Sequence, residues 1–170
     1  MVKYLKNQSG NMYVFLLMFI VLFMGVSSLV LDFGNMNIQN KKIKSSINLA
    51  VKASALQIKD GEELAGGTFL IDEEKAKDVF YDILCENLGL NRDTLEPLNK
   101  SVLYKKPNIK ELEVLNNAPT TYTSSSINKS YNIENPSVVA VVEFHVKGMF
   151  LSKNIIIDKL SSSQLTSIYD

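Results

Sequence analysis

The longest apolar stretch of the chain lies near its start. The segment Met12–Leu31 contains no charged residue, and thirteen of its residues are Val, Ile, Leu or Phe. At a rise of about 1.5 Å per residue, a helix of this length covers roughly the 30 Å hydrocarbon core of a bilayer. The pattern therefore predicts a membrane-spanning helix over residues 12–31, preceded by a short polar tail at residues 1–11.

Small and polar residues interrupt this segment without excluding it from lipid. The hydroxyl groups of Ser27 and Ser28 can bond to a carbonyl one turn earlier in the helix. Gly25 and Ser28 form a small-residue patch that a second helix could approach closely. A cleaved signal peptide is the alternative interpretation, but its apolar region normally spans about 7–15 residues and ends in a small-residue site that Val26-Ser27-Ser28 matches only in part.

The helical period continues after the apolar segment. Apolar residues fall three or four positions apart, which places them on one face of a helix. These residues are Ile43, Ile47, Val51, Ala55 and Ile58. The sequence thus predicts an amphipathic stalk helix over residues 32–60 that extends the membrane helix, with Gly34 as a place where it could kink. Its apolar stripe could pack on the chain's own outer domain or also on neighbouring copies.

The remaining residues, 61–170, predict a small α+β head. Three glycines between residues 61 and 67 break the stalk helix. Asp72 is a typical helix N-cap and Gly89 a typical residue just past a helix end, so a second amphipathic helix is expected between them. A further helical turn is expected around Arg92–Glu96.

The period becomes strand-like from Ser101 onward. Ser137–Lys147 is the strongest candidate strand, and with a turn at Gly148 and a strand at Asn154–Leu160 it predicts an antiparallel hairpin. The other candidates are Ser101–Tyr104, Leu112–Leu115 and the Thr/Ser-rich Pro119–Ile127, which is either strand or loop. The serines at 161–163 are either a solvated loop or the end of an edge strand.

Charge is balanced overall but unevenly distributed. Residues 1–60 carry seven lysines against two acids, whereas residues 61–100 carry ten acids against four bases. This asymmetry favours contact between the basic stalk of one copy and an acidic surface, such as the helix at Asp72–Asp82, of a neighbour. The basic residues are scattered and all but Arg92 are lysines, so nucleic acid is not an expected partner.

The chain is poor in residues that carry chemistry. Cys85 is its only cysteine and His145 its only histidine, so neither an intrachain disulfide nor a Cys/His zinc cluster can form. Phosphate-loop and zinc-protease motifs are missing. We therefore expect no enzyme activity, no cofactor and no metal site. An anchored hydrolase would need His145 beside an acid such as Asp158 and a nucleophile.

The first sixty residues resemble those of a known family. Gly10, the apolar helix, the step Leu31-Asp32-Phe33-Gly34 and the small-residue helix at Ala50–Ala55 follow one another as in TadE/TadG-like proteins. These are minor pseudopilins and pilus-assembly components of tight-adherence (Flp-type) type IV pilus systems. The resemblance covers residues 9–58.

The resemblance implies roles for particular residues. A prepilin peptidase would cut between Gly10 and Asn11, and the fifth mature residue would be a glutamate, where this chain has Phe15. The lack of that acid argues against a major, polymer-forming pilin, because a buried glutamate is kept in lipid only where it has a partner. It fits the TadG-like pattern better, in which the N-terminal helix is kept uncleaved as an anchor, so cleavage after Gly10 stays open. Asp32, Phe33 and Gly34 form a membrane-exit motif. Asp32 itself would cap backbone groups or lie among headgroups, or else align helices in an assembly.

Together these observations lead to one expectation and one alternative. We expect a non-enzymatic, single-pass protein of the cytoplasmic membrane, with Lys3 and Lys6 on the cytoplasmic side and the head outside. It would act as a minor pseudopilin or assembly component, contacting membrane lipid and other pilins or pilus-assembly proteins as a homo- or hetero-oligomer through its N-terminal helix. The alternative is an anchored binding module for a cell-wall or surface ligand, with the helix as a tether.

Overall fold

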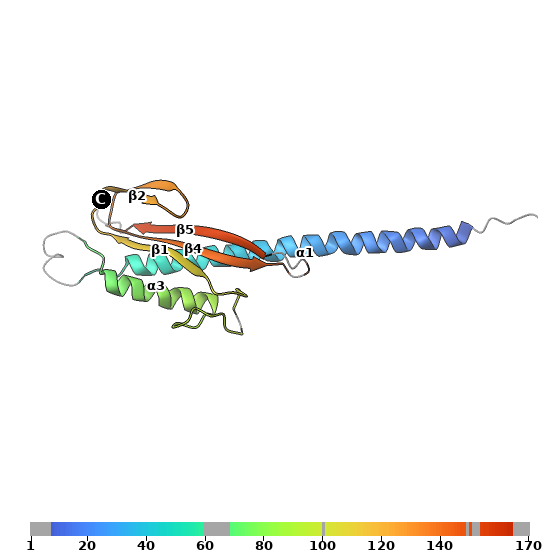
Figure 1. Cartoon of the computed structure of the whole chain (residues 1–170), viewed down its shortest axis with the longest axis horizontal. Helices are drawn as coiled ribbons and strands as arrows, with labels where there is room; N and C mark the ends of the chain where they lie inside the picture. The colour runs from blue at the N-terminus through green and yellow to red at the C-terminus, as the bar shows by residue number, and fades with distance from the viewer. Residues whose placement is uncertain (1–7, 60–68, 100, 149, 151–153, 165–170) are drawn as a thin grey trace, which may run out of the picture.

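The computed structural model describes residues 8–59, 69–99, 101–148, 150 and 154–164. Its elements are α1 (Gln8–Ala55), α3 (Glu73–Leu88), β1 (Asn108–Leu115), β2 (Thr120–Ser124), β3 (Lys129–Ile133), β4 (Ser137–Lys147) and β5 (Asn154–Gln164). In Figure 1, α3 and the strands gather around the C-terminal half of α1, while its N-terminal half projects away from them. This arrangement confirms an α+β fold with a long N-terminal helix and a pilin-like layout.

α1 is a single helix of 48 residues. At about 1.5 Å per residue it is roughly 72 Å long, more than twice the thickness of a bilayer's hydrocarbon core. It continues without a break through Gly34, where the sequence allowed a kink. The apolar segment and the stalk are therefore one continuous rod.

The C-terminal end of α1 differs from the prediction. The helix ends at Ala55, not near residue 60, and Ile58 forms an isolated antiparallel bridge with Ile71. The backbone N–H of Lys59 donates to the carbonyl of Leu70 at 2.9 Å. This pairing with the chain just before α3 replaces helical hydrogen bonds. Ile58 fits the helical spacing of the stripe, but it lies in a short extended segment paired with Ile71.

The main core lies between α1, α3 and one face of the sheet. On α1 its members are Ile43, Ile47, Ala50, Val51 and Ala55, each no more than 2% exposed. They pack against residues of α3 such as Phe80 and of β4 such as Phe144 within one cluster. The apolar stripe of the stalk is thus buried by the chain's own head.

α3 begins and ends where its capping residues predict. The Asp72 side chain accepts a hydrogen bond from the backbone N–H of Lys75 at 3.1 Å, which satisfies one of the free donors of the first turn. At the other end Gly89 adopts a left-handed conformation with φ of 67°, and Leu90 donates to the carbonyl of Cys85. Both predicted helix boundaries are confirmed.

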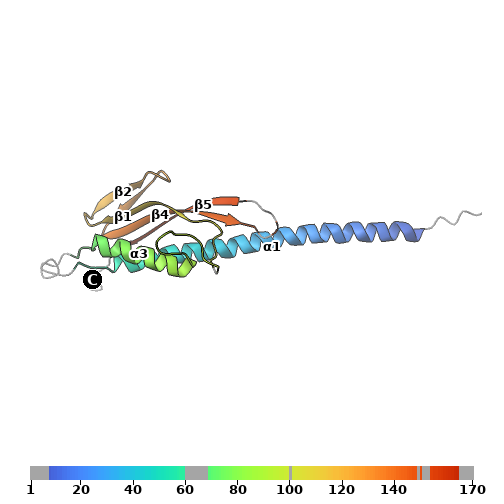
Figure 2. The same cartoon turned by 60° about the horizontal axis from the view of Figure 1, so that its bottom comes forward.

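The three-stranded sheet has the order β1-β4-β5, with both pairs antiparallel. The central strand β4 is buried on both faces along most of its length. Val138, Val142 and Phe144 face the helices, whereas Val139 joins a second, smaller core under the β2–β3 hairpin. Figure 2 shows the two helices on one side of the sheet and β2 on the other.

The strand predictions are partly correct. β4 has the predicted bounds, and β5 begins at Asn154 as predicted but runs through the serines at 161–163 to Gln164. All three serines pair with β4. In addition, Ser161 Oγ donates a hydrogen bond to Asn48 Oδ1 on α1 at 2.7 Å, which links this end of β5 to the helix. Ser101–Tyr104 is not a strand, and β3 was not predicted.

The β2–β3 hairpin is tied to the sheet by Glu111 of β1. The Glu111 carboxylate accepts hydrogen bonds from Tyr122 Oη, from Ser125 Oγ at 2.9 Å and from the backbone N–H of Ser126 at 2.7 Å. Partial burial raises the pKa of Glu111, but its hydrogen bonds from Ser126 and Tyr122 outweigh burial and lower the pKa to about 2. Burial and the neighbouring Glu111 carboxylate raise the pKa of Tyr122.

Two substitutions on α1 test how the head is seated. Ile47 is 1% exposed and Leu49 is 49% exposed. Ile47→Ala should lower the free energy of unfolding by about 2–5 kcal/mol, because it removes buried methyl groups. Leu49→Ala removes the same number of carbons from the opposite side and should change it by about 0.5 kcal/mol. Denaturant titration of the full chain in detergent micelles, followed by tyrosine near-ultraviolet circular dichroism, measures both. Equal losses would contradict this seating.

A second prediction concerns pH. Because the pKa of Glu111 falls from 4.5 to about 2 on folding, its ionised form stabilises the fold fully above pH 4.5, and this contribution is lost as the pH falls through about 2. Glu111→Gln should therefore be less stable than wild type at neutral pH, with the difference in unfolding free energy closing towards pH 2. The exposed Glu113→Gln on the same strand is the control. A difference independent of pH would refute the role assigned to the carboxylate.

Candidate functional site

The N-terminal half of α1 is the largest exposed apolar surface that the structure describes. Its large apolar side chains between Met12 and Leu31 are between 43% and 76% exposed. Among the described residues, α1 is the one helix long and apolar enough to cross a membrane. Water-soluble proteins rarely expose contiguous apolar patches of more than a few hundred Å². This half of α1 is therefore a candidate membrane span.

Ser28, a polar residue in this half, forms a hydrogen bond within the helix. Ser28 Oγ donates to the carbonyl of Met24 at 2.7 Å, the bond expected for a hydroxyl in lipid. A Cβ placed on Gly25 would meet nothing within 4 Å. Gly25 thus leaves the surface of α1 open at this point, and its predicted role in helix packing stays a prediction.

Asp32 marks the junction between the exposed half of α1 and the head. It is only 1% exposed, although it directly follows the exposed Leu31. Its Oδ1 accepts a hydrogen bond from the backbone N–H of Phe150 at 2.8 Å, across 118 positions of sequence. Two turns further on, Gln39 Nε2 donates to the carbonyl of Lys147 at 3.4 Å. α1 is therefore hydrogen-bonded to Lys147 at the end of β4 and to Phe150 just beyond it.

The three residues of the exit motif have different surroundings. Asp32 is buried in the junction, whereas Phe33 is 69% exposed. A Cβ on Gly34 would meet open space. Of the roles considered for Asp32, the structure places it as an acceptor for a backbone group, and that group belongs to a distant loop of the same chain.

A shallow notch of about 270 Å³ lies beside this junction. Phe150 closes one side, and the other side is the last part of the exposed apolar segment. Its lining from α1 consists of Phe23, Met24, Ser27, Ser28 and Leu31. Phe150 therefore lies beside the end of the apolar half of α1.

α1 also carries an exposed apolar stripe that runs from the end of the apolar segment onto the stalk and that the sequence analysis missed. Leu31, Ile38 and Leu49, here called the outer stripe, are separated by seven and eleven residues, which correspond to two and three helical turns. They lie on the side of α1 opposite Ile47, and Ile38 is 68% exposed. These spacings in the sequence indicate a second apolar stripe, but it has fewer residues than the stripe around Ile47 and was overlooked beside it.

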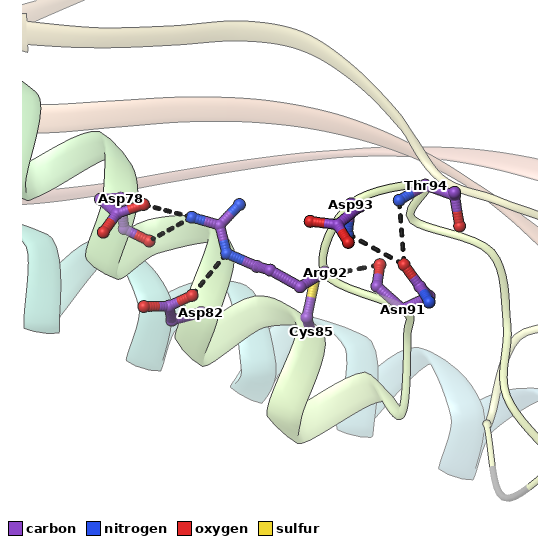
Figure 3. Close-up of polar contacts among 7 residues, drawn as sticks. All are labelled: Asp78, Asp82, Cys85, Asn91, Arg92, Asp93 and Thr94. Carbon is purple, nitrogen blue, oxygen red and sulfur yellow. Dashed lines mark hydrogen bonds and ion pairs between the residues drawn. The ribbon is translucent and has the colours of Figure 1, made fainter.

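The acidic surface of α3 is largely paired within the chain. Arg92 forms ion pairs with Asp78 and Asp82, and Figure 3 shows its guanidinium between the two carboxylates. These contacts raise the pKa of Arg92, and the hydrogen bond to Asp82 makes the largest contribution. Glu73 pairs with Lys77 at 2.5 Å. Fewer acids than the sequence suggested are therefore left for the lysines of a neighbouring stalk.

Cys85 and His145 occupy packing positions. Cys85 is 4% exposed in the core, and its burial raises the pKa of the thiol. His145 lies edge-on to the ring of Tyr104 at 6.5 Å. Glu143 and Asp158 on the same side of the sheet both pair with Lys110, at 2.9 and 2.8 Å. Within the described residues, no group of His, Cys, Asp and Glu side chains is arranged to hold a metal ion.

Gly10 and Asn11, the residues on either side of the candidate processing site, lie within the first turns of α1.

Comparison with known proteins finds no family model, no curated protein and no solved structure that matches this chain. The interpretation of the site therefore depends on its geometry and on the residues of the chain itself.

The junction can be tested through Asp32. Asp32→Ala should lower the free energy of unfolding by about 1–3 kcal/mol, because the backbone N–H of Phe150 loses a charged acceptor. It should also speed amide hydrogen exchange at Phe150, whereas Asp32→Asn, which keeps an oxygen, should have a smaller effect. Asn37→Ala, an exposed position on α1, is the control. Unchanged exchange at Phe150 in Asp32→Ala would show that this bond does not hold the turn.

Proposed function

We propose that this protein is a single-pass, non-enzymatic component of a tight-adherence pilus or related secretion apparatus, acting as a minor pseudopilin or assembly subunit. The observation that carries the proposal is the form of α1. One uninterrupted helix has an exposed apolar half followed by a half that is buried on one side in an α+β head. The TadE/TadG-like order of residues around Asp32-Phe33-Gly34 supports the same assignment.

The proposed orientation follows from the charges around the apolar segment. Lys3 and Lys6 precede it and stay in the cytoplasm, while the head after Asp32 lies outside the cytoplasmic membrane. The lysines on the far side do not oppose this orientation, because long C-terminal domains are translocated largely regardless of charge. Phe15, at the position of the pilin glutamate, is consistent with a minor subunit and not with a major pilin.

Lateral contact between helices is the proposed mechanism of assembly. Gly25 offers close approach within the lipid. Above it, Ile38 and Leu49 of the outer stripe face away from the head and are free to pack against a partner helix. The exposed Lys41 and Lys42 lie between them and would set orientation more than affinity, since individual surface charge pairs are weak.

Cysteine crosslinking in membranes tests this mechanism. Ile38→Cys, on the outer stripe, should form disulfide-linked adducts with itself or with other pilus subunits when cells that make the whole apparatus are oxidised. Thr121→Cys, exposed on β2, should not, and the wild-type chain controls for the buried Cys85. The chain should also remain in the membrane pellet after extraction with alkaline carbonate.

The outcomes separate the proposal from its alternative. A chain released by carbonate would contradict the membrane assignment. A chain that stays in the membrane but gives no adduct at Ile38 would contradict assembly through the stalk. If an unrelated membrane helix in place of residues 1–34 then preserved function, the helix would be only a tether for a binding head.

A further inference from the structure

We propose that Phe150, which lies between β4 and β5, makes a second membrane contact, in which its side chain enters the outer interface of the bilayer beside α1. This inference rests on the proposed function, because it takes Met12–Leu31 to span the membrane. It adds a surface of the head itself, distant in sequence from the helix, that binds lipid.

The depth of Phe150 follows from its hydrogen bond. Its backbone N–H is 2.8 Å from Oδ1 of Asp32, the residue directly after the apolar segment. The segment ending at Leu31 has the length of the hydrocarbon core, about 30 Å. Phe150 is therefore placed at the level where hydrocarbon meets the headgroups. In Figures 1 and 2, the end of β4 lies beside α1 where the helix leaves the head.

The side chain of Phe150 is directed towards lipid and away from the core. It is 60% exposed, and the notch it closes is lined by Phe23, Leu31 and other residues of the apolar segment. Those residues are surrounded by acyl chains when the segment spans a bilayer. The notch then opens onto lipid, and an acyl chain is the occupant whose chemistry fits both of its walls.

Asp32 lowers the cost of placing the backbone of Phe150 at this depth. A backbone N–H without a hydrogen-bond acceptor is costly at the edge of the hydrocarbon, because lipid offers it no partner. The buried Asp32 carboxylate accepts the N–H of Phe150, so this group reaches the apolar boundary already bonded. The residue that directly follows the apolar segment of α1 thus also satisfies the backbone of Phe150 at the boundary with lipid.

Tryptophan fluorescence provides the test, because the chain contains no tryptophan. Phe150→Trp, Phe19→Trp in the apolar segment and Phe69→Trp at the far end of the head each introduce one reporter. The full-length variants are reconstituted into phosphatidylcholine vesicles whose acyl chains carry bromine, a quencher, either close to the headgroup or close to the methyl end.

The three reporters give separate answers. Phe150→Trp should lose emission to the shallow bromines more than to the deep ones and should emit at shorter wavelength than Phe69→Trp, which should not be quenched. Phe19→Trp should be quenched most by the deep bromines. If Phe19→Trp is quenched and Phe150→Trp behaves like Phe69→Trp, the lipid contact is refuted and the membrane helix stands. If Phe19→Trp is not quenched, the proposed function and this inference both fail.

Discussion

The burial of one face of α1 in the head is the constraint on which the rest of the structure depends. A helix surrounded by lipid can be apolar on every side, whereas the same helix outside the membrane must present a single apolar face to a core. The sequence changes between these patterns at Asp32, and Ile43, Ile47 and Val51 continue the apolar face that β4 and α3 cover. Because the helix does not break at this change, the head cannot move independently of the rod.

Local patterns in the sequence were sufficient for the elements with strong internal signals. β4 is an unbroken run of strand-forming residues, and its prediction needed no knowledge of its partners. α3 was delimited by Asp72 and Gly89, whose capping roles depend only on the adjoining backbone. The same holds for Ser28, whose hydroxyl bonds to its own helix.

The failures have a common physical cause in distant contacts. Ile58 fits a helical spacing, but its backbone pairs with residues near Ile71. β3 is mostly polar and is held by its pairing with β2. At the candidate site, the sequence named Asp32 as part of a membrane-exit motif, but the backbone group that it binds lies 118 positions away. No local pattern signals such a partner.

The unbroken form of α1 also makes it a lever. Membrane helices tilt to match the thickness of the bilayer around them. About 36 Å of helix separates Leu31 from Ala55, so a change in tilt of about 10° moves the far end of the head by roughly 6 Å. With the apolar half of α1 in a bilayer, as proposed, a thinner or thicker membrane would therefore change how far the head leans from the membrane normal. Membrane thickness would then help to position the surface of the head.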